Sequence, residues 1–263
     1  MAHALLVASR SGNLLKRGWQ PVGRLELDND AGVYRFFYTQ GAKELEDFHP
    51  FPQMENLEQV YESSELFPIF ANRLLSKSRP EYEAYLKWGG FNPDNPPEPL
   101  SILGVTEGRR ETDSIEMFPC PVPDSSGCYV NKFFLHGLRW MPAAALKRID
   151  QLKQGEELYF MLDVSNLTDF QAVALRPAKG DCFMIGYVPR YLARDVYKIL
   201  WQCCPEVKIL VERVNKDAPL QQRLLCRMHG CWPEGFRPCD DEAFKPIPKD
   251  IPVRCEEAFS DPP

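Results

Sequence analysis

A cluster of prolines limits what this chain can fold into. Residues 92–99, NPDNPPEP, hold four prolines in eight positions, and the whole chain of 263 residues holds 24. Proline lacks a backbone N–H, and its ring clashes with the preceding turn of a helix. Neither a packed helix nor a central strand can therefore pass through this segment. The cluster predicts a linker between two separately folded parts.

The composition is that of a globular protein. Hydrophobic residues make up 44% of the chain and charged residues 26%, which is enough to build a packed core. No apolar stretch approaches the ~20 residues that span a bilayer, and residues 1–15 do not resemble a secretory signal. We therefore expect a cytoplasmic protein with no membrane partner. The net charge of −6 argues, for the chain as a whole, against a nucleic-acid binder.

The nine cysteines follow no regular framework and contain no CxxC pair. In a chain without a secretory signal, reduced thiols are the expected state. Zinc ligands usually come in close pairs, so a zinc site is a weak hypothesis. Whether zinc binds is left open for one set of residues: Cys226, His229, Cys231 and Cys239.

Before the proline cluster, residues 4–38 have the pattern of short strands. Residues 33–38, VYRFFY, are aromatic or branched except at Arg35, and the turn NDAG at 29–32 predicts a hairpin over 25–38. Apolar positions spaced by three and four residues predict a helix over 66–75, and residues 81–88 predict another that ends at Gly89-Gly90. We expect an α+β domain over residues 1–112.

After the cluster, short strands alternate with two helices. Strands are expected at 115–120, 132–140, 157–163, 170–176, 183–188, 207–215 and 224–228, and helices at 142–152 and 191–203. This pattern predicts a small barrel of the OB or SH3 size class over residues 113–235. The chain is proline-rich from Trp232 on and is expected to wrap the surface there, with residues 236–263 as a C-terminal tail.

No motif for catalysis is present in the sequence. The four histidines form no HxxxH or HEXXH pair, and there is no GxSxG, P-loop or GxGxxG. Asp163 and Asp169 flank one polar turn, where carboxylates most often accept hydrogen bonds from backbone N–H groups. We therefore expect a protein that is not an enzyme and that needs no cofactor.

Three segments of the second half carry a more specific pattern. They are FLHGLRW at 134–140, the polar loop and strand DVSNLTDFQAVAL at 163–175, and IGYVPRY at 185–191. In this order and spacing, from Phe133 to about Arg227, they resemble the HIRAN family, a small DNA-binding module. The resemblance implies a modified OB-like barrel and a pocket for the 3′ end of single-stranded DNA. Six candidate nucleic-acid-binding residues follow: Arg139, Trp140, Asn166, Asp169, Tyr187 and Arg190.

The resemblance implies a role for each of these side chains. Trp140 and Tyr187 would stack on bases, which every single-strand binder needs. The two arginines would contact phosphates, and Asn166 would contact a base edge or brace the loop. Asp169 would accept a hydrogen bond from a free 3′-hydroxyl and repel a phosphate. Thr168 stands where the family pattern has an aromatic residue, which puts one stacking face in doubt.

A structural interpretation of the same residues stays open beside this one. Trp140 and Tyr187 would then pack in the core or at its rim, and the loop at 163–169 would be a hairpin turn capped by its own side chains. Arg139 and Arg190 would pair with surface carboxylates.

The charge is unevenly divided along the chain, so the net charge of the whole chain does not exclude a nucleic-acid-binding segment. Residues 131–230 contain 15 Lys or Arg against 10 Asp or Glu, so they carry +5 and the rest of the chain carries −11. Local basicity is what matters for contact with phosphates. The leading hypothesis is therefore a two-domain, bacterial-type protein whose second domain binds DNA, as in DNA repair.

Two alternatives come from other classes. The first is an interaction module, in which the acidic N-terminal half binds a protein partner in a DNA-processing or toxin–antitoxin system. In that half, residues 65–75, ELFPIFANRLL, resemble the N-terminal subdomain of HipA-type toxins. The second is a metal-dependent hydrolase or nuclease, which would use Asp163 or Asp169.

Overall fold

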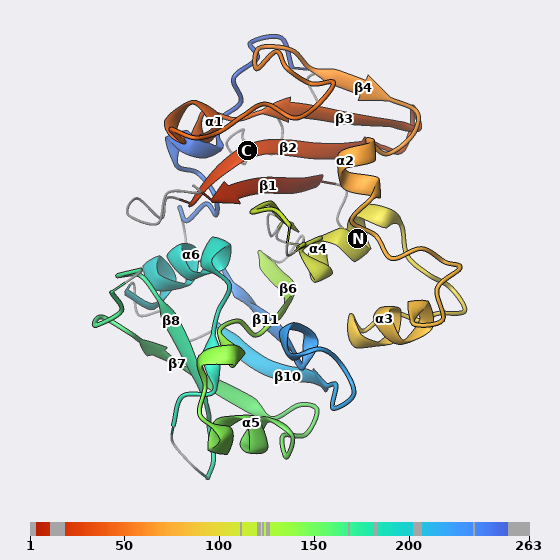
Figure 1. Ribbon diagram of the computed structural model, residues 1–263. Coiled ribbons are helices and arrows are strands. Elements are labelled where there is room, and N and C mark those ends of the chain that lie inside the picture. Colours follow the sequence, from red (N-terminus) through yellow and green to blue (C-terminus); the bar gives the residue numbers. More distant parts are fainter. Residues whose placement is uncertain are drawn as a thin grey trace. The chain divides into compact units, whose positions relative to one another are not determined.

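The structure, a computed structural model, describes most of the chain (Figure 1). The described residues are 4–10, 19–110, 112–119, 122, 124, 127–167, 169–180, 183–201, 207–233 and 235–251. Within them, the strands form two antiparallel sheets, one of five strands and one of six, and short helices accompany both. The protein therefore belongs to the α+β class, as predicted.

The chain divides into two compact units that interleave along the sequence. Unit 1 comprises Met1–Leu75, Glu98–Cys120 and Cys239–Pro263, and unit 2 comprises Ser76–Pro97 and Pro121–Pro238. One passage between the units falls at Pro97–Glu98, inside the proline cluster. The sequence instead predicts contiguous domains over 1–112, 113–235 and 236–263, which differ from these two units. Which segments fold independently stays a prediction.

The sheet of unit 1 has the strand order β4-β3-β2-β1-β5. The predicted hairpin is present, with Leu25 opposite Phe36. β5 follows residue 112 in the chain, yet it pairs with β1, where Phe118 lies opposite Leu6. The elements of this unit are β1 (Ala4–Arg10), β2 (Trp19–Asp28), β3 (Val33–Tyr38), α1 (Gly41–Glu44), β4 (Tyr61–Ser63), α2 (Pro68–Ala71), α4 (Pro99–Thr106), β5 (Glu116–Pro119) and the 3-10 turn η3 (Glu242–Phe244).

Aromatic side chains fill the core of unit 1. The ring of Phe36 lies 4.9 Å from Tyr38, 5.6 Å from Phe51 and 5.3 Å from Phe70, measured between centroids. The C-terminal segment completes this core: Ile247 is buried, and its N–H donates to the carbonyl of Tyr38 at 2.9 Å. The prediction that the tail wraps the surface is therefore wrong for this segment, because its apolar residues between the prolines are buried.

The sheet of unit 2 has the strand order β6-β11-β10-β7-β8-β9 and curls. An isolated bridge joins the chain beyond β6 to β9, at the other edge. His136 and Tyr187 exchange backbone hydrogen bonds of 2.9 and 3.0 Å there. The small barrel-like module predicted from the sequence is confirmed. Its elements are α3 (Tyr82–Trp88), β6 (Cys128–Phe134), η1 (Leu138–Trp140), α5 (Ala143–Ile149), β7 (Glu157–Leu162), β8 (Val173–Pro177), β9 (Gly186–Tyr187), α6 (Arg190–Trp201), β10 (Lys208–Val214), η2 (Leu220–Gln222) and β11 (Leu224–Cys231).

Alternation along the strands of unit 2 separates an inner from an outer face. Ile209 on β10, Met228 on β11 and Leu158 on β7 lie opposite one another and are buried. Their chain neighbours point to the other side, because successive side chains of a strand alternate. The register of the strands therefore shows which side chains lie on the outer face of the sheet.

Two element predictions need correction, and one helix was missed. The helix expected over 66–75 is only the single turn α2, because Pro68 opens it and the chain leaves the helix after Ala71. The strand expected over 132–140 ends at Phe134. Gly137 has φ 76°, a left-handed conformation that breaks a strand, and η1 follows it. α4 was not predicted, since its first residue is the last proline of the cluster, a position that helices accept.

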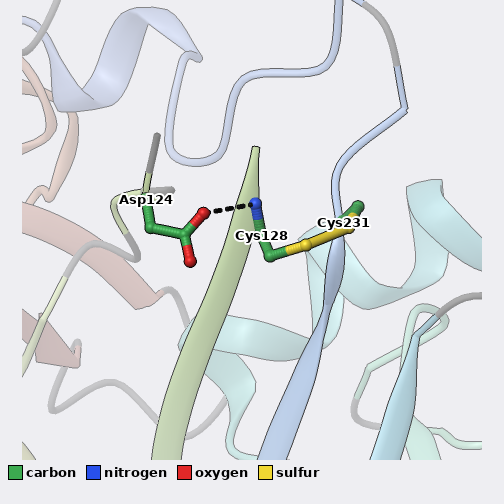
Figure 2. Close-up of a disulfide and its surroundings, with 3 residues drawn as sticks. All are labelled: Asp124, Cys128 and Cys231. Carbon is green, nitrogen blue, oxygen red and sulfur yellow. Dashed lines mark hydrogen bonds between the residues drawn. A yellow bond between two sulfur atoms is a disulfide. The ribbon is translucent and has the colours of Figure 1, made fainter. Parts of the chain in front are cut away.

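A disulfide joins the two neighbouring strands β6 and β11. Cys128 lies opposite Cys231 in the register, with a Cα–Cα distance of 4.1 Å (Figure 2). The backbone N–H of Cys128 also donates to the carboxylate of Asp124 at 3.1 Å. The expectation of reduced thiols is wrong for this pair. The two cysteines are 103 positions apart, so only the strand pairing brings them together.

Candidate nucleic-acid interface

The polar loop between β7 and β8 is held by its own side chains. Asn166 accepts a hydrogen bond from the N–H of Asp169 at 3.0 Å, and Asp169 accepts one from the N–H of Gln171 at 3.0 Å. Asp163 accepts a further bond from the hydroxyl of Ser165 at 3.0 Å. The capped turn considered from the sequence is therefore present. Its effect is to fix the two carboxylates in place.

Tyr187 of β9 connects this loop to the edge of the sheet. Its hydroxyl donates to Oδ2 of Asp163 at 2.9 Å, and the same oxygen accepts a bond from the amide of Asn166 at 3.1 Å. The bond from Tyr187 is the main reason why the pKa of Asp163 lies below its ordinary value. Burial first, and then the carboxylate, raise the pKa of Tyr187. Asp163 is thus an ionised acceptor at neutral pH.

The second carboxylate of the loop faces the start of α6. Oδ2 of Asp169 lies 3.2 Å from Nε of Arg190, and both side chains are partly exposed. The sequence left open that Arg190 pairs with a carboxylate, and it does so here. The carboxylate is that of Asp169, which is itself a candidate site residue. Hydrogen bonds and this ion pair form one continuous chain of groups: Tyr187, Asp163, Asn166, Asp169 and Arg190.

Arg139 and Trp140 lie in η1, which approaches Tyr187 through a glycine. A Cβ added to Gly137 would lie 2.8 Å from Cδ2 of Tyr187, so only a glycine lets the ring pack this closely. The guanidinium of Arg139 lies 4.7 Å from the ring centroid of Trp140, a cation–π contact. Trp140 is 74% exposed, so its packing in a core is excluded.

The loop also presents apolar side chains that the candidate list did not include. Leu167 is 104% exposed and Phe170 is 74% exposed, and Val164 is exposed as well. Thr168, where the family pattern has an aromatic residue, lies outside the described residues. On the other side of Asp169 in the chain, Phe170 offers an exposed ring. From the sequence, Asp163 was noted as a turn carboxylate and as a residue for the nuclease alternative, but not as a DNA-binding residue. Its position two residues beyond an outward-facing Met161 is the signal that would have placed it beside Tyr187.

The described residues offer no metal site. Within the ranges given above, no group of three or more His, Cys, Asp or Glu is arranged to hold a metal ion. Of the residues left open for zinc, Cys231 belongs to the disulfide, and Cys226 is buried with its pKa raised by burial. Asp163 and Asp169 serve in the hydrogen-bonded chain described above.

Unit 2 thus carries a curled antiparallel sheet whose edge bears a fixed polar loop, a tyrosine, and an arginine beside an exposed tryptophan. Unit 2 is thus a small β-module with a candidate site at the edge of its sheet. Residues 129–229 match the family model described as the HIRAN domain, and this part of the chain is a HIRAN domain. A HIRAN domain implies binding to DNA.

Two solved structures are similar to part of this chain. A protein from Lactobacillus plantarum is 15% identical with a TM-score of 0.33, and the match covers 40% of this chain and 97% of that one. The HIRAN domain of human HLTF is also 15% identical, with a TM-score of 0.29 and coverages of 40% and 78%. No curated protein matches the chain. Among the described residues, no helix is long and apolar enough to cross a membrane.

Proposed function

We propose that this HIRAN domain binds single-stranded DNA at its 3′ end and that the protein acts as a binder rather than as an enzyme. One observation carries the proposal: hydrogen bonds and one ion pair form a continuous chain within the HIRAN match, through Tyr187, Asp163, Asn166, Asp169 and Arg190. Such a chain presents a stacking ring, an acceptor and a cation in fixed positions. These are the groups that the end of a DNA strand needs.

The bases have aromatic surfaces to stack on. Trp140 is exposed, and Tyr187 is held in place by Asp163 and by Gly137. Stacking of one base on an aromatic ring is worth about 1–3 kcal/mol and tolerates any base. Arg139 lies over Trp140 and supplies a positive charge for the neighbouring phosphate.

Asp169 supports a preference for a free hydroxyl over a phosphate. An ionised carboxylate has about four acceptor positions. Asp169 uses one for the N–H of Gln171 and one toward Arg190, so acceptor capacity is left for a 3′-hydroxyl. A terminal phosphate about 5 Å away would be repelled by up to about 3 kcal/mol at an effective dielectric constant of about 20. Arg190 offsets part of this repulsion, so we expect a preference of about fivefold.

Fluorescence anisotropy with 5′-labelled oligonucleotides tests the proposal. One oligonucleotide ends in a 3′-hydroxyl, and the other, of the same sequence, ends in a 3′-phosphate. The full chain should bind the first about fivefold more tightly at low salt. Negligible binding of both would refute DNA binding by this site, and equal tight binding would refute the end preference.

Two variants assign the effect to the loop. Asp169→Asn keeps the shape of the side chain but removes its charge, so the two oligonucleotides should bind with similar affinity. Asp94→Asn is the matched control, since Asp94 is exposed in the same unit and lies outside the site. This control should keep the preference. Incubation of the same oligonucleotides with Mg²⁺ should leave them intact, and cleavage that depends on Asp163 would favour the nuclease alternative.

A further inference from the structure

The outer face of the curled sheet carries a row of side chains that the candidate site does not use. The register places His229 of β11 opposite Lys208 of β10, and Tyr159 of β7 opposite Arg176 of β8. Ile209 lies opposite Leu158, and strands β10 and β7 are antiparallel, so Lys208 falls opposite Tyr159. These four residues, His229, Lys208, Tyr159 and Arg176, cross four neighbouring strands in line, and we call them the outer row.

The outer row faces away from the core. Leu158, Ile209 and Met228, which precede or follow its members in the chain, are buried. Lys208 and Tyr159 are exposed, the latter at 43%, and His229 and Arg176 are partly exposed. The row spans three gaps between strands, or about 14 Å at about 4.8 Å each.

The outer row combines the aromatic and positively charged side chains that single-stranded DNA needs for binding. The guanidinium of Arg176 lies 5.0 Å from the ring centroid of Tyr159, so an aromatic face and a cation stand together. Lys208 adds a second positive charge next to the same ring. One carboxylate, Glu157, belongs to the adjacent outward position of β7, opposite Leu210. The row therefore keeps a positive charge around an exposed aromatic ring.

The outer row continues the face on which Tyr187 lies. Met161, Ala174 and Tyr187 form the next line across β7, β8 and β9. Tyr159 is two residues from Met161 along β7, and two strand spacings separate β7 from β9. These steps put Tyr159 about 12 Å from Tyr187. A strand whose end is held at Tyr187 would therefore reach the outer row within a few nucleotides.

We propose that the outer row binds the single strand on the 5′ side of its held end, with Tyr159 stacking on a base and with Lys208 and Arg176 contacting phosphates. This proposal rests on the proposed function, because the end must be held at Tyr187 for the strand to run this way. The row then sets the length of DNA that the domain occupies, independently of how the end is chosen.

Oligonucleotide length is the variable that tests the row. A trinucleotide and a dodecanucleotide that share the same 3′-hydroxyl end are compared by competition against one labelled probe on the full chain. The dodecanucleotide should bind at least tenfold more tightly. If the two bind equally, the outer row is refuted while the proposed function stands. If neither binds, the proposed function itself fails.

Variants assign the gain to the row. Tyr159→Ala should lower the affinity for the dodecanucleotide about fivefold or more and leave the trinucleotide unchanged, whereas Tyr159→Phe keeps the ring and should bind normally. Lys208→Ala should reduce the slope of log affinity against log salt by about 0.7 for the dodecanucleotide only. Lys147→Ala, an exposed lysine of α5, is the matched control. A length gain that persists in Tyr159→Ala and Lys208→Ala would overturn the proposal.

Discussion

Loss of the Cys128–Cys231 bond should weaken unit 2 by an amount that follows from chain length. The bond closes a loop with a sequence separation of 103 residues. In the chain-entropy model, a loop of about this size restricts the unfolded state by about 4.7 kcal/mol at 25 °C. Measured values are typically about 2–4 kcal/mol, because real unfolded chains retain structure. We expect reduction of the disulfide to lower the free energy of unfolding of unit 2 by about 2–4 kcal/mol without preventing folding.

Folding should survive because the strands do not depend on the bond. β6 and β11 pair over seven positions, from Leu225 opposite Phe134 to Cys231 opposite Cys128. The bond is at one end of this ladder, so the backbone hydrogen bonds remain when it is broken. The effect should therefore appear in the free energy of unfolding rather than in the far-UV circular dichroism of the native protein.

Urea unfolding followed by tryptophan fluorescence measures the effect. Trp232 follows Cys231 directly, and its ring lies 4.9 Å from that of Tyr129, so the fluorescence senses the end of the ladder. Cys128→Ser should unfold like the reduced wild type, and dithiothreitol should not change its stability further. The chain has nine cysteines, so no more than seven thiols should react in denaturant without reductant. Nine reactive thiols, or equal stability of the oxidised and reduced proteins, would refute the reasoning.

Three further substitutions test individual contacts. Gly137→Ala should lower the free energy of unfolding by about 1–3 kcal/mol and weaken DNA binding, since φ is 76° and the new Cβ would lie 2.8 Å from Tyr187; thermal melts and anisotropy would report it. Tyr187→Phe removes the donor that lowers the pKa of Asp163, so an NMR titration should show this pKa rising toward 3.8, and an unchanged value would contradict the bond. Ionised Asp163 stabilises the fold above its unfolded pKa, and this stability is lost as the pH falls through its lowered folded pKa. Tyr187→Phe should bring the folded and unfolded pKa values closer together, so the pH range over which this stability is lost should become narrower. Tyr38→Phe should cost about 1–3 kcal/mol by urea unfolding, because the N–H of Phe51 loses its buried acceptor, and a neutral substitution would count against it.

Local patterns predicted the elements that depend on local chemistry. The hairpin over 25–38 was predictable because a polar turn separates two branched and aromatic runs, and α6 because its apolar residues repeat at helical spacing. The strand expected over 132–140 ends at Phe134, and Gly137 beyond it leaves room for the ring of Tyr187, a contact with a residue distant in sequence that no local pattern shows.

The candidate site shows the same division. Asn166 and Asp169 lie in one loop, so their contact follows from their spacing. The contacts of Tyr187 with Asp163 and of Arg190 with Asp169 depend on the pairing of β8 with β9, which no local pattern encodes. The family resemblance grouped Asp169, Tyr187 and Arg190 in one candidate site, but it did not predict these contacts. The binding roles of these residues, and the HipA-like interpretation of the N-terminal half, stay predictions.

The interleaved units have a consequence for synthesis on the ribosome. Domains usually complete in order from the N-terminus during translation. Here unit 2 ends at Pro238, whereas unit 1 still lacks its last segment, including the buried Ile247. The HIRAN domain is therefore fully translated while the unit that began first is still waiting for its final core residues. A nascent chain stalled shortly after residue 238 has left the exit tunnel should already bind DNA, before unit 1 is complete.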